Sequence, residues 1–325
     1  MVPDDSHLPT PVPAPVPASA PAPVPAPVPA SAPAPVPAPV PASAPTPVPA
    51  PAPASAPALA PASSLAPAAP EPPRALSFDR AAAQYAAARP GYPPALFDAV
   101  EELAHHPLRG ARTIDVGAGT GISTRLLHER GALVTAVEPG AGMAQELHRS
   151  HPALPVVRGD GNRLPLATAS ADLITYAQSW HWTDRTLATA EALRVLRPGG
   201  ALALWWNVSD HSVPWIAEQD ARLRRFFGAG DSAHGSPVRS RDLPSGLDFT
   251  HRRLPWTRRV PLDTHLANLG SHSAFLVLGA EPTQRFLAEE RARLAELFPD
   301  GTVEESYAVD LSVAVSPAAP PLPTP

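Results

Sequence analysis

From residue 75 onward, short runs of apolar residues alternate with longer segments in which apolar residues recur at helical spacing. This alternation is typical of a parallel sheet whose strands are connected by helices. Five strands are predicted in order: "TIDV" (113–116), "LVTAV" (133–137), "PVVR" (155–158), "ADLITYA" (171–177) and "ALALWW" (201–206). The fifth shows no polar alternation, as expected of a central strand that is buried on both faces.

Helices are predicted between these strands by apolar spacing: through "GISTRLLHER" (121–130), which Gly131 can cap, over 143–150, and over 186–196 after the fourth strand. The segment "RPGG" (197–200) is predicted as a turn. Further on, the pattern predicts a helix over 214–227, late strands over 249–260 and 302–315, and helices near 262–276 and 282–297. Together these elements predict an α/β fold with a doubly wound, mostly parallel seven-stranded sheet. We expect the last strand to be antiparallel and to close one edge.

The first 73 residues differ from the rest of the chain, because 27 of them are proline. A 12-residue unit recurs here four times, at 9–20, 21–32, 33–44 and 45–56. Proline fixes φ and donates no backbone hydrogen bond, so we predict a disordered arm of polyproline-II character. The predicted organisation is therefore a Pro/Ala-rich arm (1–73), one folded domain (75–315) and a Pro-rich tail (316–325).

Composition excludes several classes of chemistry. The net charge of −5 argues against nucleic-acid binding. All 25 positive side chains are arginine, which excludes Schiff-base chemistry and a phosphate-loop lysine. No cysteine is present, so disulfides and thiolate ligands are excluded. The chain begins without a secretory pattern and contains no apolar run of about 20 residues, so we expect a soluble cytoplasmic protein that does not associate with membranes.

A glycine turn follows the first predicted strand. Gly117, Gly119 and Gly121 form a G-x-G-x-G spacing directly after Asp115, and Glu138 ends the second strand. Glycine turns of this kind bind nucleosides, and an acidic residue after the second strand accepts hydrogen bonds from ribose hydroxyls. The dinucleotide fingerprint, however, is G-x-G-x-x-G. A carboxylate just before the turn would repel a pyrophosphate and suits a ligand that carries an ammonium group.

The segment "IDVGAGTG" (114–121) resembles the first motif of the class I S-adenosylmethionine-dependent methyltransferases, in particular the small-molecule type 11 group. The resemblance continues in order through Glu138, "GDGNRLPLATASADLI" (159–174) and "LRVLRPGGALAL" (193–204). It implies a Rossmann-like fold, S-adenosylmethionine as the cofactor, and methyl transfer to a small molecule.

The resemblance also implies cofactor-binding roles for Asp115, Gly117, Ala118, Gly119, Gly121, Glu138, Asp160, Gly161 and Gln178. The glycines would let the backbone pass the amino-acid end of the cofactor, with Asp115 near its ammonium group and Glu138 on the ribose. Asp160 would accept a hydrogen bond from the adenine amino group, in a loop that Gly161 and Asn162 line. Gln178 would lie near the sulfonium.

Methyl transfer is an in-line displacement, so the protein needs to align donor and acceptor, exclude water and, for some acceptors, remove a proton. In "AQSWHWTD" (177–184), His181 is a candidate general base between two tryptophans, and Gln178 is a second catalytic candidate. The "SWHW" element (179–182) resembles an element of those family members that esterify carboxylates such as trans-aconitate. The alternative is structural: core packing by Trp180 or Trp182, and helix capping by Thr183 or Asp184.

Upstream, "FDRAAAQYAAARPGYP" (78–93) resembles the N-terminal cap segment of the same family. The resemblance implies that Tyr85, Arg89 and Tyr92 close the pocket, and an arginine here favours a carboxylate-bearing ligand. The alternative is a plain helix followed by a proline-stopped turn. His272 and Ser273 are further candidates for a polar patch that faces the pocket.

No metal site is predicted, because His105 and His106 are adjacent, while His148 and His151 lack a nearby acidic ligand. Two other functions stay open at this point. One is a nicotinamide-dependent oxidoreductase, which the glycine spacing and Asp115 oppose. The other is a catalytically silent cofactor-binding or scaffold domain, with a protein partner bound to the Pro-rich arm.

Deletion of residues 1–73 should leave cofactor binding and thermal stability nearly unchanged, because a proline-rich arm of this composition buries little apolar surface. Calorimetric titration with S-adenosylhomocysteine and thermal unfolding of the full and shortened chains check this. A large loss of stability in the shortened chain would show that the arm is part of the folded domain.

Overall fold

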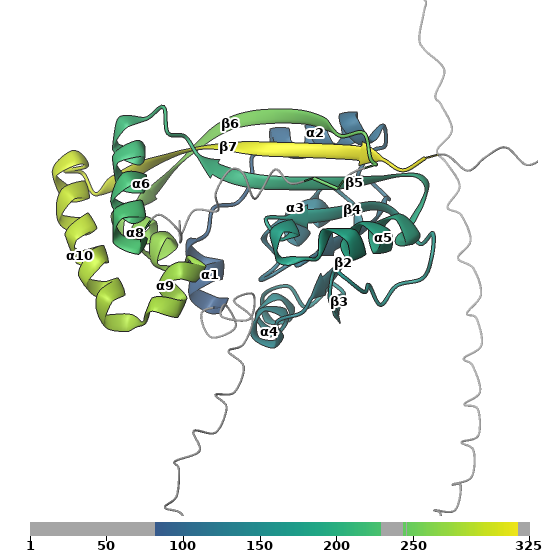
Figure 1. The fold of residues 1–325 in the computed structure, drawn as a ribbon, viewed down its shortest axis with the longest axis horizontal. Coiled ribbons are helices and arrows are strands. Elements are labelled where there is room, and N and C mark those ends of the chain that lie inside the picture. Colours follow the sequence, from purple (N-terminus) through teal and green to yellow (C-terminus); the bar gives the residue numbers. More distant parts are fainter. Residues whose placement is uncertain (1–81, 229–242, 245, 318–325) are drawn as a thin grey trace, which may run out of the picture. The chain divides into compact units, whose positions relative to one another are not determined.

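The computed structural model describes residues 82–228, 243–244 and 246–317 (Figure 1). The predicted arm over 1–73 lies outside the described residues, as does most of the predicted tail, so both remain predictions. The strands are β1 (Arg112–Val116), β2 (Leu133–Glu138), β3 (Val156–Arg158), β4 (Ala171–Ala177), β5 (Leu196–Ser209), β6 (Thr250–Pro261) and β7 (Thr302–Val315). The helices are α1 (Ala82–Ala88), α2 (Pro94–Ala104), α3 (Ile122–Glu129), α4 (Ala141–Ser150), α5 (Arg185–Val195), α6 (Pro214–Phe227), α8 (Leu262–Gly270), α9 (Ser273–Leu278), α10 (Ala280–Leu297) and the 3-10 turn η2 (Trp180–Trp182).

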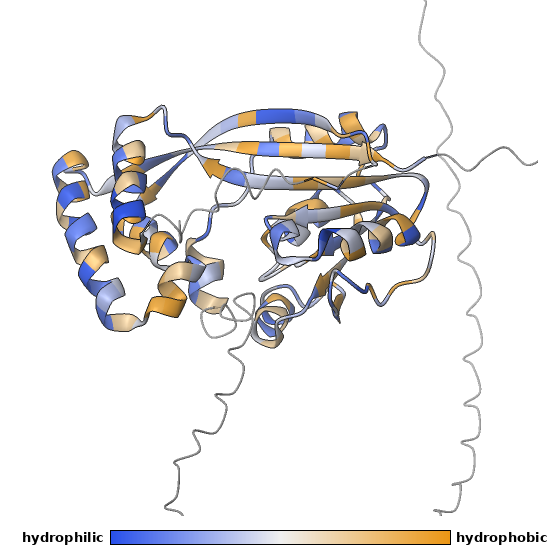
Figure 2. Cartoon of the chain, viewed as in Figure 1, coloured by the Kyte–Doolittle hydropathy of each residue, from blue (hydrophilic) through white to orange (hydrophobic). Residues whose placement is uncertain are grey.

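The seven strands form one sheet in the order β3-β2-β1-β4-β5-β7-β6. Strands β1 to β5 pair in parallel, and β7 pairs antiparallel with both β5 and β6. The predicted α/β fold with a doubly wound, mostly parallel sheet is therefore confirmed. The last strand is antiparallel as expected, but it lies between β5 and β6, and β6 forms the edge. The edge strand carries a hydrophilic stretch along its middle (Figure 2), which protects an open edge from further pairing.

Successive residues of β5 point to two different cores, one on each face of the sheet. Ala203 and Trp205 pack with α2 and with β7. Leu204 and Trp206, on the opposite face, pack with α5 and with the chain after β4. Burial on both faces explains why the strand has no polar alternation. The helices α2 and α5 therefore shield the sheet from opposite sides.

The "RPGG" segment does not form a separate turn. It lies within β5, where the pairing with β4 shifts register between Ala171 and Leu173. A Cβ atom on Gly200 would lie 3.0 Å from the carbonyl oxygens of Arg197 and Asp172. Glycine at position 200 permits the close approach of two strands. This packing explains why glycine, which is typical of turns, occurs inside a strand.

The helices α6, α8, α9 and α10 gather beyond one end of the long strands β6 and β7 (Figure 1). The predicted helices over 214–227 and near 282–297 correspond to α6 and α10. The helix predicted near 262–276 is two helices, α8 and α9, which separate at the fully buried Ser271. Helix α2 has no counterpart among the predicted elements. Within the described ranges, no helix combines the length and apolar character needed to cross a membrane.

The glycine turn lies at the carboxyl ends of β1 and β4. Gly117 has φ +65°, and a Cβ atom built on it would lie 2.5 Å from the Cβ of Ser179. The Ser179 hydroxyl donates a hydrogen bond to the carbonyl of Val116, so Ser179 is held in place. Both the backbone conformation and the contact therefore require glycine at position 117.

Gly117→Ala should lower the free energy of unfolding by about 3 kcal/mol, because left-handed strain adds to the collision with Ser179. Gly199→Ala is the matched control, since Gly199 has φ +73° but no heavy atom within 4 Å of a Cβ. Strain alone should cost the control about 1 kcal/mol. Urea denaturation measures both variants, and equal losses would show that Ser179 moves aside freely.

Candidate cofactor and acceptor site

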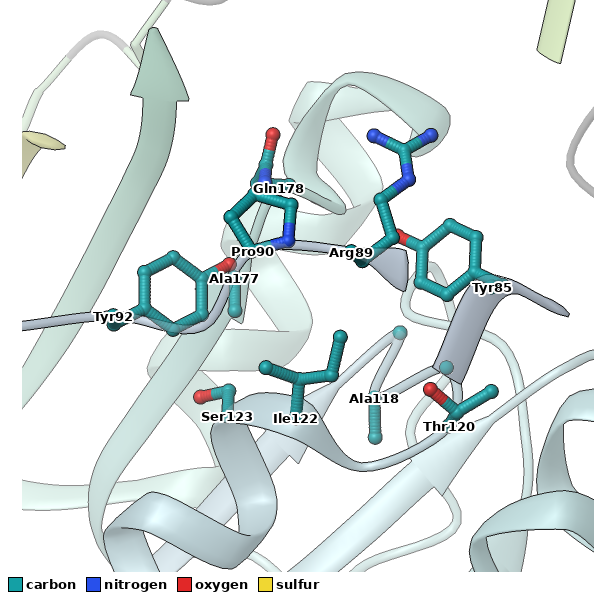
Figure 3. Close-up of a pocket in the computed structure, with 12 residues that line it drawn as sticks. Tyr85, Arg89, Pro90, Tyr92, Ala118, Thr120, Ile122, Ser123, Ala177 and Gln178 are labelled. Carbon is teal, nitrogen blue, oxygen red and sulfur yellow. The ribbon is translucent and has the colours of Figure 1, made fainter. Parts of the chain in front are cut away.

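A pocket opens at the carboxyl ends of β1 and β4, between the glycine turn and the segment that connects α1 to α2 (Figure 3). Its lining residues are Tyr85, Arg89, Pro90, Tyr92, Gly117, Ala118, Gly119, Thr120, Ile122, Ser123, Ala177 and Gln178. The site predicted from sequence is therefore assembled from three separate segments. In parallel α/β sheets, ligands bind at this end of the strands.

The glycine turn forms the floor of this pocket. Among the described residues, no heavy atom lies within 4 Å of a Cβ built on Gly119, so they leave the space above it open to a ligand. The Thr120 hydroxyl is buried and has no hydrogen-bond partner in the described part of the chain. Helix α3 begins at Ile122, immediately after the turn, and its first amide groups are suited to bind an anion such as a carboxylate.

Glu138 lies behind the turn and braces it. One oxygen of its carboxylate accepts a hydrogen bond from the amide of Gly119, and the other accepts one from the amide of Gly140, each at 2.7 Å. The residue is 6% exposed. The predicted ribose role of Glu138 remains a prediction.

Asp115 is fully buried beneath the turn and does not line the pocket. Its carboxylate accepts hydrogen bonds from the hydroxyls of Thr124 at 2.7 Å and Thr175 at 2.8 Å. Burial raises the pKa of Asp115 from 3.8 to about 6, although these hydroxyls oppose the change. The predicted role of Asp115 near the ammonium group remains a prediction, and from this position the charge would act through the floor of the pocket without direct contact.

The α1–α2 segment forms the cover. The guanidinium of Arg89 lies 4.6 Å from the centre of the Tyr85 ring, and its Nη2 donates to the carbonyl of Ser271 at 3.2 Å. Arg89 Nε is buried without a hydrogen-bond partner among the described residues. A buried guanidinium nitrogen without a partner is costly, so the cover is suited to an anionic ligand group.

Tyr92 and Gln178 lie toward the other end of the pocket (Figure 3). Tyr92 packs edge-on against Trp205, with ring centroids 5.9 Å apart. Burial raises the pKa of Tyr92, so its hydroxyl stays protonated near neutral pH. Gln178 has φ +60°, which is rare for a residue other than glycine, and its backbone N–H donates to the carbonyl of Trp205. Strained backbone of this kind is common at binding sites.

The predicted arrangement of His181 between two tryptophans in the pocket is not what the structure contains. Trp180 is fully buried and packs edge-on against Tyr176, whereas His181 and Trp182 are exposed on η2 and do not line the pocket. The side chain of Asp184 caps α5 by accepting a hydrogen bond from the amide of Leu187. The structural alternative therefore accounts for Trp180 and Asp184.

The loop after β3 packs against Thr183 and the end of β1. Gly161 is buried, and a Cβ on it would lie 3.0 Å from Thr183 and 3.1 Å from Val116. Asn162 accepts a hydrogen bond from the amide of Asp184, which ties the loop to the start of α5. Asp160 is exposed, accepts from the amide of Asn162, and does not line the pocket, so its adenine role remains a prediction.

The remaining candidates lie outside the lining. His272 is the N-cap of α9 and Ser273 is its first residue, next to the Ser271 carbonyl that Arg89 contacts. In the described part of the chain, no group of three potential metal ligands occurs. Thr120, Ile122 and Ser123 line the pocket but are absent from the predicted set. Their place within the glycine turn and in the first turn of the predicted helix was a signal in the sequence that could have identified them.

Comparisons with known proteins agree with this geometry. The family model described as "Methyltransferase domain" matches residues 114–204. An uncharacterized methyltransferase of Mycobacterium tuberculosis is 35% identical over 222 residues, which cover 68% of this chain and 86% of the relative. A solved structure described as a candidate type II methyltransferase, from Anaeromyxobacter dehalogenans, is 27% identical with a TM-score of 0.56, and the match covers 71% of this chain and 99% of that one.

The chain belongs to the methyltransferase-domain family, and it is an S-adenosylmethionine-dependent methyltransferase. The residues of the pocket fit this cofactor. The open space above Gly119, the unpartnered hydroxyl of Thr120 and the unpartnered Nε of Arg89 provide room and polar groups for its amino-acid end. The family decides against the nicotinamide alternative.

Asp115→Asn should make the fold more stable at pH 7, by up to about 3 kcal/mol, because it removes a buried charge whose pKa is raised. Between pH 4 and 6 the folded wild type binds more protons than the unfolded chain, so wild-type stability should fall as the pH rises through this window. The variant should lack that slope. Its affinity for S-adenosylhomocysteine should decrease, since the buried negative charge favours a cationic ligand. Denaturation at several pH values and calorimetry measure these effects.

The control for this variant is Asp172→Asn on the neighbouring strand. The hydrogen bond from Arg112 lowers the pKa of Asp172, so loss of that carboxylate should destabilise the fold at pH 7. An Asp115→Asn protein that is less stable than wild type and keeps the wild-type pH slope would contradict our account of Asp115.

Proposed function

We propose that this methyltransferase acts on a small-molecule acceptor that carries an ionised carboxylate. The observation that carries the proposal is the make-up of the described pocket lining, which contains one arginine and no aspartate, glutamate or histidine to serve as a general base. Arg89 is the one charged side chain in the described lining, and its Nε lacks a protein partner. A guanidinium binds a carboxylate through two parallel hydrogen bonds. Its ligand is the carboxylate of the acceptor or that of the cofactor's amino-acid part.

The lining also supports an acceptor that needs no general base. No aspartate, glutamate or histidine is among the described lining residues, and Tyr92 stays protonated. A hydroxyl or ammonium acceptor must lose a proton during methyl transfer. A carboxylate is already ionised at neutral pH and attacks directly. This chemistry does not need His181, which lies outside the lining.

The cofactor and the lining residues have separate roles in this site. Bound S-adenosylmethionine supplies a methyl group that its sulfonium activates. Gly119 and Thr120 would border the amino-acid end of the cofactor, and Tyr85 and Arg89 would cover it. Gln178 borders the same pocket and would orient the acceptor. The protein therefore contributes alignment and exclusion of water, which are the main requirements of an in-line displacement.

The shape of the site supports a small acceptor over a macromolecular one. The cover and the glycine turn face each other across the pocket (Figure 3), so an acceptor must fit between them. The net charge of −5 opposes a nucleic-acid substrate. The cytoplasmic location, the absence of membrane association and a protein partner for the Pro-rich arm remain predictions.

Methyl-labelled S-adenosylmethionine and a cell extract test the proposal. After incubation with the protein, ultrafiltration separates small molecules from macromolecules, and alkali then releases volatile labelled methanol from methyl esters only. We expect the label in the ultrafiltrate and in base-labile form. Base-stable label, or label retained with macromolecules, would overturn the acceptor class and leave the family assignment intact. Failure to transfer label to any fraction, with cofactor binding retained, would support the silent alternative.

Arg89→Gln tests the role of the guanidinium in the same assay. The change keeps a polar side chain but removes the charge, so KM for the acceptor or for the cofactor should rise about tenfold. Arg285→Gln on α10 is the control, because Arg285 is an exposed arginine whose ion pair is with Glu281. Equal KM values in the Arg89 variant and in wild type would remove Arg89 from the site.

A further inference from the structure

Two carbonyl groups of the cover accept hydrogen bonds from distant strands. The carbonyl of Ala88 accepts from Nη2 of Arg258 on β6, at 3.0 Å. The carbonyl of Gly91 accepts from Nδ2 of Asn207 on β5, also at 3.0 Å. These two contacts lie on either side of Arg89 in the sequence. Neither Arg258 nor Asn207 lines the pocket.

Arg258 is fixed in turn by Glu305 on β7. The Glu305 carboxylate is 2% exposed and accepts hydrogen bonds from Arg258 Nε at 2.5 Å, from the Tyr307 hydroxyl at 2.9 Å and from His265 Nδ1 at 2.6 Å. Burial raises the pKa of Glu305, but these partners outweigh it and lower the pKa overall. The guanidinium thus binds a buried anion with one nitrogen and reaches the cover with another.

Asn207 is oriented through the same cluster. Its Oδ1 accepts a hydrogen bond from Trp256 Nε1 at 3.0 Å, so its Nδ2 faces the carbonyl of Gly91. Trp256 stacks on Tyr307, with ring centroids 5.3 Å apart and an interplanar angle of 26°. Tyr307 donates to Glu305. The Asn207 contact with the cover is thus connected to the Glu305 cluster through Trp256 and Tyr307.

The cover has little local support of its own. Helix α1 has seven residues, and helices of this length are not stable in isolation. In the described part of the chain, Gln84 also donates to the carbonyl of Ala267 at 3.4 Å, and Arg89 donates to the carbonyl of Ser271 at 3.2 Å. The position of the segment 88–92 over the pocket therefore depends on contacts with distant elements, among them the side chains of Asn207 on β5 and Arg258 on β6.

We infer that Arg258 and Asn207 are positioning residues that hold the segment 88–92 against the cofactor pocket. They act through Arg89 and Tyr92, which line the pocket, and touch no ligand themselves. The inference rests on the family's cofactor site and does not depend on the acceptor. Loss of either contact loosens the cover and weakens cofactor binding while every lining side chain is still present.

Arg258→Met tests this with a closely matched control, Arg222→Met. Both arginines are mostly buried, with side-chain exposures of 18% for Arg258 and 16% for Arg222. Each pairs at 2.5 Å with a buried glutamate, and the glutamate side chains are 2% exposed for Glu305 and 0% exposed for Glu290. The Arg222 hydrogen bonds go to Glu290 and not to the cover, and two side chains, Gln219 and His265, lie between Glu290 and Glu305. Hydrogen exchange of the amides in 82–93 and calorimetry with S-adenosylhomocysteine are the two measurements.

In Arg258→Met, exchange in 82–93 should speed up and affinity for S-adenosylhomocysteine should fall about tenfold. Arg222→Met should keep both values near wild type, even if its thermal stability falls equally. Arg258→Lys should restore only part of the affinity, because one ammonium group does not replace a guanidinium that binds two partners at once.

Asn207→Asp is the second variant, and it decides the question if Arg258→Met does not fold. It keeps the acceptor for Trp256 but removes the donor to Gly91, so exchange should again speed up and affinity should again fall. Unchanged exchange and affinity in the folded variants overturn the inference. Equal losses of affinity in Arg258→Met and Arg222→Met overturn it too, because the effect would then follow general stability. S-adenosylhomocysteine reports on the cofactor site alone, so failure here is distinct from failure of the acceptor proposal.

Discussion

Gly117 packs directly against the side chain of Ser179, where the carboxyl ends of β1 and β4 meet. A side chain at position 117 would push these two segments apart, and the pocket depends on their close approach. The contact places Gly119 and Gln178 around one space, although the two lie on different turns. It also sets the direction in which the chain enters α3, whose first residue is Ile122. The other parts of the site, including the Thr120 hydroxyl and the cover, surround the space next to this contact.

Two buried carboxylates serve the site in opposite ways. The described partners of Asp115 are hydroxyl groups and a backbone amide, so burial dominates and its pKa is raised. Glu305 has a guanidinium and an imidazole as partners, so its pKa is lowered. A buried charge such as that of Asp115, which lowers the stability of the fold, is expected beneath a pocket where function requires it. A charge with well-placed hydrogen-bond partners, including the guanidinium of Arg258, can instead organise its surroundings, as Glu305 does for the cover.

The reaction is defined by the family, whereas the acceptor is defined by other parts of the chain. The family model matches residues 114–204, which include the glycine turn and Glu138. The cover precedes this range, and Asn207, Arg258 and Glu305 all follow it. Segments outside a shared cofactor-binding core are where members of a fold family differ in function. This is why the methyl donor follows from similarity, while the acceptor must be argued from the charge and proton chemistry of the pocket.

Local patterns in the sequence were sufficient for the α/β class, for the bounds of β4, α6 and β7, and for the glycine turn with Glu138 behind it. These features depend on periodic burial and on backbone conformations that only glycine adopts freely, and neighbouring residues encode both. The tertiary structure alone decided that β7 lies inside the sheet and that His181 is not among the residues that line the pocket. It also decided that Arg258 reaches the carbonyl of Ala88, 170 residues away. Contacts of this kind depend on how distant strands align, and no local pattern of apolar and polar residues specifies that alignment.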